Sequence, residues 1–237
     1  MNPGELTVFH WPQAPALPSP GQPVLVRVSS AASRGVVRVQ LRETAQQILA
    51  AWTGRPLHSP LLHETSRGPV CRESVAGYTV NLSFSYSSDA GWIALLLGGP
   101  IGVDAMRPEA FPEMPSVTRL YLGPDAWPMI AASTDPARAF AHAWTECEAQ
   151  LKFFGQGLVE WRERDCPTDD VPSGEASAAR VWPRLVARDR LPPPVFRGWR
   201  AHPMLRRYVQ EHEHTVVTVV TVARLFRTVS TVAAIIR

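Results

Sequence analysis

The amino-acid sequence predicts a mixed α+β fold, because it contains two helical patterns and several short strand patterns. Apolar residues recur at helical spacing over residues 36–53, and the helix-start sequence Ser-Thr-Asp-Pro precedes a second helix that runs to Phe154. Residues 78–85 alternate between apolar and polar side chains, and residues 216–222 are β-branched almost throughout, as is typical of strands. Together these helices and strands indicate the α+β class.

The other elements follow from local patterns. Residues 24–28 form a short predicted strand, and a Ser-Asp-Ala-Gly turn joins strand 78–85 to strand 92–97 as a hairpin. The remaining expectations, in chain order, are a loop at 56–78, a strand at 101–104, a Pro-rich connector at 107–116, a short helix and turn at 117–131, a polar loop at 165–180, and strands at 181–186, 195–199 and 228–236. The connector divides the chain into two segments, 1–113 and 114–237, each with a helix and antiparallel strands.

Composition indicates a folded protein and gives no support for nucleic-acid binding, a structural zinc site or a disulfide framework. The chain has 237 residues, of which 45% are hydrophobic and 19% charged, and its formal net charge is +3; this is too little charge for a disordered chain. The basic residues are spread along the chain, so the mild excess does not argue for binding to nucleic acid. Three distant cysteines without CxxC spacing argue against a structural zinc site and a disulfide framework.

No segment has the pattern of a secretory signal or a membrane span. The first 15 residues lack a basic segment followed by an apolar run. The most apolar candidate, residues 215–236, is interrupted by Arg224 and Arg227. We therefore expect a cytoplasmic protein that does not bind membranes.

Lys152 is the one lysine among 24 basic residues. A coding bias that exchanges lysine for arginine would spare a lysine whose role needs a compact ammonium, and chance survival is an equal alternative. Trp144, Glu148 and Lys152 are spaced i, i+4, i+8 on the predicted helix, so they share one face. Taken alone, the same stripe also fits a surface ion pair beside a core tryptophan.

Three motifs occur in a fixed order over roughly residues 35–160. They are Asn81-Leu82-Ser83-Phe84-Ser85, Gly102-Val103-Asp104, and the helix sequence from Trp144-Thr145 through Glu148 and Lys152 to Gly155-Gln156-Gly157-Leu158. The intervals between them are about 20 and about 40 residues. In order and spacing they resemble the F-N-[IL]-S-H-S, G-[IV]-D and W-[ST]-x-K-E-[AS]-x-x-K-x-x-G-x-G-L motifs of the Sfp-type 4′-phosphopantetheinyl transferases.

The resemblance implies an enzyme that moves phosphopantetheine from coenzyme A to a serine of an acyl or peptidyl carrier protein. It implies Mg²⁺ held by Asp104 and Glu148, a serine proton taken by Glu148, and a leaving phosphate met by Lys152. It also implies two similar lobes with a pseudo-twofold relation, each a helix packed on a small antiparallel sheet, with the ligand cleft between them. Such a protein is expected to be a monomer.

Arg42, Arg67 and Ser83 are the further contacts with coenzyme A that the resemblance suggests, beside Lys152. Arg42 is placed where family members often carry an arginine on the first helix. Ser66-Arg67-Gly68-Pro69 resembles a permuted form of the family's G-K-P loop, which makes Arg67 a stand-in for its lysine. An arginine is otherwise usually solvated surface.

Three positions depart from the family's pattern. Met106 replaces an acid, Phe84 replaces a histidine that contacts coenzyme A phosphate, and Cys147 replaces a lysine. These departures favour an alternative, a degenerate and non-catalytic member that only binds a carrier protein or coenzyme A. The retained Asp104, together with the acid and lysine of the helix, opposes that alternative.

Two further features have simpler interpretations. His212 and His214 flank an acid in a polar turn, where a metal pair is conceivable but plain surface is the commoner case. Nothing near Cys147 in the sequence predicts a lowered thiol pKa.

Overall fold

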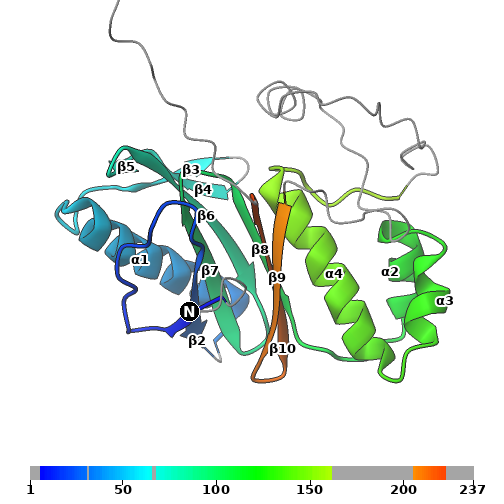
Figure 1. The fold of residues 1–237 in the computed structure, drawn as a ribbon. Coiled ribbons are helices and arrows are strands. Elements are labelled where there is room, and N and C mark those ends of the chain that lie inside the picture. The colour runs from blue at the N-terminus through cyan, green and yellow to red at the C-terminus, as the bar shows by residue number, and fades with distance from the viewer. Residues whose placement is uncertain (1–5, 31, 66–67, 162–204, 223–237) are drawn as a thin grey trace, which may run out of the picture.

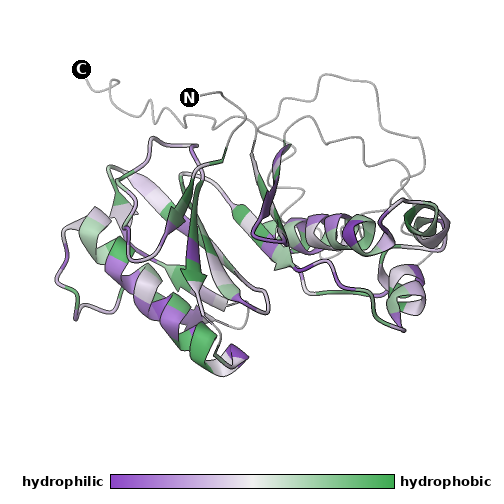
Figure 2. Ribbon diagram, turned by 90° about the horizontal axis from the view of Figure 1, so that it is seen from below, coloured by the Kyte–Doolittle hydropathy of each residue, from purple (hydrophilic) through white to green (hydrophobic). Residues whose placement is uncertain are grey.

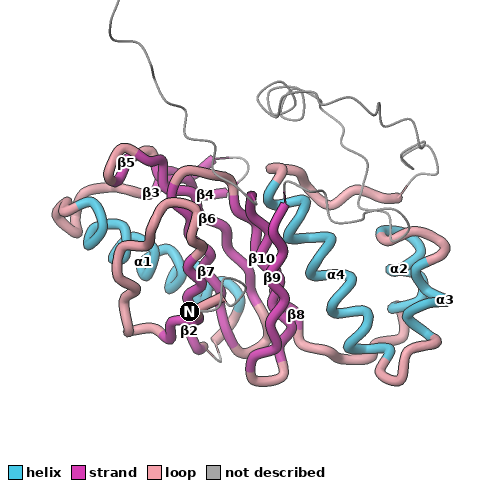
Figure 3. Tube along the Cα trace, viewed as in Figure 1, coloured by secondary structure: helices cyan, strands magenta, loops and turns pink. Residues whose placement is uncertain are grey.

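The computed structural model describes residues 6–30, 32–65, 68–161 and 205–222. Its helices are α1 (Arg34–Thr53), α2 (Met114–Tyr121), α3 (Ala126–Ala131) and α4 (Pro136–Phe153) (Figure 1). Its strands are β1 (Val8–His10), β2 (Val24–Ser29), β3 (Leu62–Thr65), β4 (Gly68–Cys71), β5 (Ser74–Val75), β6 (Tyr78–Tyr86), β7 (Ala90–Leu97), β8 (Ile101–Met106), β9 (Leu205–His212) and β10 (Thr215–Val222) (Figure 3). The α+β class is confirmed, whereas the strands expected at 181–186, 195–199 and 228–236 lie outside the described residues.

The described strands form three sheets. A five-stranded sheet has the order β1-β2-β7-β6-β5, a three-stranded sheet has the order β8-β10-β9, and β3 pairs with β4. Only β1 and β2 run parallel among these pairs. Strand β8 precedes residue 113 but pairs with β10 from far along the chain, and the division of the chain at that residue stays a prediction.

The sheets and helices stack in layers (Figure 2). Helix α1 covers one face of the five-stranded sheet, where Leu41 and Ile48 pack with Val26 and Ile93. The other face of that sheet packs on the three-stranded sheet through the buried residues Leu25, Trp92, Leu96, Val103, Val217 and Val219. Helix α4 covers the outer face of the three-stranded sheet, and α2 and α3 pack against α4. The core is therefore divided among the layers.

The main helices and the hairpin agree closely with their sequence patterns. Helix α4 begins after Asp135, whose side chain accepts a hydrogen bond from the Arg138 backbone N–H at 3.0 Å, with Pro136 in the first helical position. It ends just before Gly155, which has a φ of 66°. Strands β6 and β7 form the predicted antiparallel hairpin. These predictions are confirmed to within a few residues.

Residues 56–78 were expected to be a loop, and that expectation is wrong. They contain β3, β4 and β5, which are two to four residues long and mostly exposed or half-buried. Strands this short bury too few side chains to produce a clear alternation. Strands β1 and β9 also had no predicted counterpart; β1 has only three residues, and β9 is a polar edge strand, with the sequence Leu-Arg-Arg-Tyr-Val-Gln-Glu-His.

Gly102 lets strand β8 approach helix α4 closely. A Cβ at this position would overlap the carbonyl oxygen of Ala149 and would lie 2.6 Å from the Phe153 nitrogen. Both neighbours are backbone atoms of α4, so neither can move aside cheaply. Because side chains alternate along a strand, Asp104 faces α4 as well, two residues after this contact.

Candidate functional site

Strand β8 and helix α4 hold the central acidic and basic groups of the candidate site. Asp104 belongs to β8, while Glu148 and Lys152 belong to α4 and are one helical turn apart. The lysine reaches across to the strand, with Lys152 Nζ 2.7 Å from Asp104 Oδ1. The structure thus brings together three residues that the sequence singled out.

Lys152 has two acceptors on β8. Its Nζ donates to Asp104 Oδ1 at 2.7 Å and to the carbonyl oxygen of Val103 at 3.1 Å, and it lies 4.0 Å from Glu148 Oε2. The side chain keeps 29% of its surface exposed. An ammonium has three N–H donors, so one can still donate to a ligand beside the strand.

Asp104 is buried, and its two hydrogen bonds end on the same oxygen. Oδ1 accepts from Ser85 Oγ at 2.7 Å and from Lys152. Within the described chain, no residue donates a hydrogen bond to Oδ2. That second oxygen therefore retains its lone pairs for a cation or a donor group.

The electrostatic surroundings of Glu148 raise its pKa above the ordinary value. Burial is the largest cause, and the nearby charge of Asp104 adds to it. Lys152 and Arg34 act in the opposite direction without cancelling the effect. A carboxylate with a raised pKa binds a proton more readily, which is the property that a general base needs.

Two serines of β6 hold β8 beside the five-stranded sheet. The Val103 N–H donates to Ser83 Oγ and the Ala105 N–H donates to Ser85 Oγ, each at 3.1 Å. Strands β6 and β8 belong to different sheets, so the two hydroxyls accept the hydrogen bonds that backbone carbonyls would accept between paired strands. Ser83 thus helps to position the strand that carries Asp104.

Two pockets share Phe84, Tyr86 and Lys152 in their walls. The larger has a volume of about 570 Å³ and is also lined by Arg42 and Ser83. The smaller has a volume of about 380 Å³ and holds Asp104, Glu148, Ser85, Met106, Arg34 and Trp144. Both candidate acids therefore line the smaller pocket, and Lys152 lies in the wall that the two pockets share.

Helix α1 presents a basic stripe to both pockets. Arg34, Arg38 and Arg42 are spaced i, i+4, i+8 and so project from one side of the helix. Arg34 lines the smaller pocket, while the other two line the larger. The guanidinium carbons of Arg34 and Arg38 each lie 5.5 Å from the centre of the Tyr86 ring. Sequence reasoning missed the first two arginines, although their spacing was visible.

Arg42 is already paired with an acid. Its Nε donates to Glu64 Oε1 at 2.6 Å and its Nη2 donates to Oε2 at 3.3 Å, so Arg42 holds the pKa of Glu64 below its usual range. A phosphate would have to compete with this pair. Arg67 lies outside the described residues; its neighbours Thr65 and Gly68 line the larger pocket.

The three residues that depart from the motifs of the resembling family lie in different places. Phe84 lines both pockets and Met106 lines the smaller one. Cys147 instead is 3% exposed in the core between α4 and its neighbouring helices, and burial raises the pKa of its thiol to about 12. The thiol is therefore unreactive at neutral pH.

Two comparisons with known proteins gave no match. Neither the scan against protein-family models nor the search of curated proteins found a match to this chain. Among the described residues, no helix is both long enough and apolar enough to cross a membrane.

The carboxylates of the smaller pocket fit a magnesium ion. Mg²⁺ prefers one or two carboxylates and keeps several waters, and Asp104 Oδ2 and Glu148 are hard oxygen donors on the wall of one pocket. The charge of Asp104 contributes to the raised pKa of Glu148, and a divalent cation would relieve that repulsion. Thr218, which pairs with Asp104 across the sheet, is fully buried and offers no third acid.

Proposed function

We propose that the chain transfers the 4′-phosphopantetheine group of coenzyme A to a serine of an acyl or peptidyl carrier protein. The observation that carries the proposal is the contact of Lys152 with Asp104 at 2.7 Å, with Glu148 one turn away in the same pocket. These are the residues on which the family motifs centre. The proposal draws further support from the larger, arginine-lined pocket beside them.

Coenzyme A would bind in the larger pocket, with its phosphates toward the stripe of arginines on α1. A volume of about 570 Å³ lies in the range of small-molecule sites. Arg38 and Lys152, which both line this pocket, would supply positive charge, and Arg42 would exchange Glu64 for a phosphate. Ser83, which accepts the Val103 N–H, would act mainly by holding β8.

The chemistry forms a bond between the carrier serine Oγ and the phosphorus next to pantetheine, and breaks the pyrophosphate bond. Glu148 would take the serine proton, because burial raises its pKa above the ordinary value of a carboxylic acid. The third N–H of Lys152 would donate to the leaving phosphate oxygen of adenosine 3′,5′-bisphosphate. Asp104 and Glu148 would hold Mg²⁺, which when bound supplies neutralising charge for the phosphate oxygens.

The proposal also includes two similar lobes with the ligand cleft between them, a monomeric state and a cytoplasmic location. Residues of both segments, 1–113 and 114–237, line each pocket, which supports a ligand cleft between two lobes. A helix on each outer sheet face supports a pseudo-twofold relation, with α1 on five strands and α4 on three. We propose that the protein acts as a monomer in the cytoplasm.

One observation favours the alternative of a non-catalytic protein that binds coenzyme A or a carrier protein. Phe84 occupies the wall shared by both pockets, where the resembling family places a phosphate-binding histidine. The pairing of Arg42 with Glu64 also reduces the charge available to phosphates. A binding protein would take up coenzyme A without consuming it.

The decisive experiment incubates the full chain with coenzyme A, Mg²⁺ and a panel of apo carrier proteins, and measures each carrier's intact mass. The proposal predicts a gain of one phosphopantetheine group and release of one adenosine 3′,5′-bisphosphate per carrier. The matched control is Lys152→Ala, which should transfer more slowly. Binding of coenzyme A without either product would favour the alternative.

A further inference from the structure

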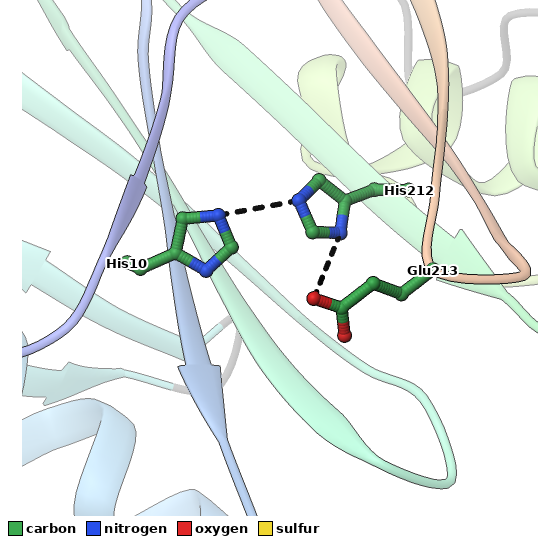
Figure 4. A group of neighbouring side chains, drawn as sticks. All are labelled: His10, His212 and Glu213. Atoms are coloured by element: carbon green, nitrogen blue, oxygen red, sulfur yellow. Dashed lines mark hydrogen bonds and ion pairs between the residues drawn. The ribbon is translucent and has the colours of Figure 1, made fainter.

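Three side chains of types that can bind a metal ion lie close together outside both pockets (Figure 4). His10 ends β1 and His212 ends β9; the two residues are 202 positions apart in the chain, and their Nε2 atoms are 3.2 Å apart. Glu213 follows in the β9–β10 turn, with Oε1 3.9 Å from His212 Nδ1. A ligand atom of each residue lies within 4.8 Å of the others.

The geometry of the two rings matches a shared metal ion. Their nearest nitrogens point toward each other in Figure 4. The ring centres are 4.9 Å apart with a 47° tilt, so the rings do not stack. Two nitrogens bound to one tetrahedral Zn²⁺ would be about 3.3 Å apart, given zinc–nitrogen distances of about 2.0–2.1 Å. A hydrogen bond between neutral rings has a similar length, so further observations must separate the two cases.

The charges around the cluster favour a cation. Arg27 lies beside it but is paired with two acids, with Nη2 2.7 Å from Glu213 Oε2 and 3.1 Å from Asp89 Oδ2. With both imidazoles neutral, the group carries an excess of one negative charge. A bound cation would meet attraction there rather than repulsion.

The turn holds Glu213 beside His212 in an unusual backbone conformation. Glu213 and His214 have φ values of 45° and 66°, which non-glycine residues seldom adopt and which hairpin turns normally assign to Asn or Gly. His212 Nδ1 is buried without a hydrogen-bond partner among the described residues. The Glu213 carboxylate is the nearest acid to this nitrogen, and metal-bound histidines commonly point their second nitrogen at a carboxylate.

We propose that His10 and His212 bind one Zn²⁺ through their Nε2 atoms, with Glu213 orienting His212 and water completing the coordination. Imidazole ligands select zinc over magnesium, so this site is separate from the carboxylates at the pockets and does not depend on the proposed function. The ion would join β1 to the β9–β10 hairpin. Since it would bind only the folded chain, it would stabilise the fold.

The test titrates the full chain with ZnCl₂ in a calorimeter and repeats the titration with MgCl₂. We expect one Zn²⁺ per chain that His10→Ala removes, whereas the heat of Mg²⁺ binding should be the same in the wild type and in His10→Ala. His10→Ala removes an exposed ligand from a three-residue strand, so the variant should fold, and it should bind Zn²⁺ at least about a hundredfold more weakly. Glu213→Gln should weaken binding about tenfold.

The matched control is His214→Asn, because His214 is an exposed imidazole in the same turn and Asn tolerates its backbone conformation. This variant should bind Zn²⁺ as the wild type does. An equimolar amount of Zn²⁺ should raise the melting temperature of the wild type and of this control, but not that of His10→Ala. Failure of the wild type to bind at micromolar Zn²⁺, or equal affinity in His10→Ala, would overturn the proposal.

Discussion

Lys152 is held by geometry that a guanidinium cannot reproduce. Its Nζ contacts Asp104 Oδ1 at 2.7 Å and Val103 O at 3.1 Å, while arginine spreads its charge over a larger planar head. We expect Lys152→Arg to lower the transfer rate about ten- to a hundredfold, or roughly 1–3 kcal/mol of transition-state stabilisation. The melting temperature should change little, because the charge near Asp104 remains. The measurement is the transfer rate at saturating carrier protein. An unchanged rate would mean that Lys152 forms only a surface ion pair and takes no part in the transfer.

Glu148 should make the stability of the fold depend on pH. Because its pKa is raised in the folded chain, its stabilising contribution is fully present below the unfolded pKa and is lost as the pH rises through the folded pKa. Glu148→Gln is neutral at every pH. We expect this variant to lose transfer activity, yet to melt higher than the wild type at pH 7 and equally near pH 4. Melting curves across that range provide the check, and a pH-independent difference would contradict it.

Side chains on one helix face were predictable, whereas contacts between distant segments were not. Glu148 and Lys152 follow from i, i+4 spacing, and the same rule would have found Arg34 and Arg38 on α1. Ser85 was inside a recognised motif, but its bond to Asp104 at 2.7 Å depends on β8 lying beside β6. The contact of His10 with His212 joins positions that no local pattern connects.

Among the helices and strands, the packing of β8 on α4 depends on Gly102. A methyl group there would overlap backbone atoms of Ala149 and Phe153. We therefore expect Gly102→Ala to lower the free energy of unfolding by roughly 1–3 kcal/mol, as overpacking does. Gly35→Ala is the control, since nothing lies within 4 Å of a methyl group at that helical position. Urea unfolding of both variants measures the difference, and equal stability would mean that β8 and α4 are not so close.

The basic stripe of α1 should act in binding rather than in the chemical step. Arg38 is exposed, lines the larger pocket and lies 5.5 Å from the Tyr86 ring centre. We expect Arg38→Ala to raise the KM for coenzyme A about tenfold with little change in kcat, because it removes a charge-assisted bond distant from the reacting atoms. Arg55, near the other end of α1 and paired with Glu73, is the matched control. Steady-state kinetics that show equal effects for the two would argue against the stripe.

Helices and strands were predicted correctly where the sequence carries strong local signals. Helix α4 has both an N-terminal cap and a terminal glycine, and β10 is β-branched almost throughout. Strand β9 escaped because its edge position allows Arg206, Arg207, Gln210 and Glu211 to face solvent or lie half-exposed, and polar edges give no core signal. The short strands β3 and β4 were missed because two four-residue runs of half-buried and exposed residues resemble loop sequence.

Taken as one molecule, the chain forms its candidate site where its layers meet. Strand β8 follows the β6–β7 hairpin in the chain but pairs with β10 of the other sheet. Ser83 and Ser85 of β6 also accept hydrogen bonds from the backbone of β8. From the sequence, this strand was assigned to the N-terminal segment, 1–113, together with the strands that precede it. Its partner strand could not be inferred, because pairing between distant segments is set by packing and not by local sequence.

In the function that we propose, Asp104 acts together with Glu148 and Lys152 of α4 in phosphopantetheine transfer. Asp104→Asn tests it most directly, since the amide keeps the shape and can still accept from Ser85 and Lys152 while losing the charge. The measurement compares single-turnover transfer to an apo carrier protein, at saturating coenzyme A and Mg²⁺, between this variant and the wild type. We expect transfer by Asp104→Asn to be at least about a hundredfold slower, while circular dichroism shows a folded variant. Transfer at the wild-type rate, or no transfer by the wild type itself to any carrier tested, would contradict it.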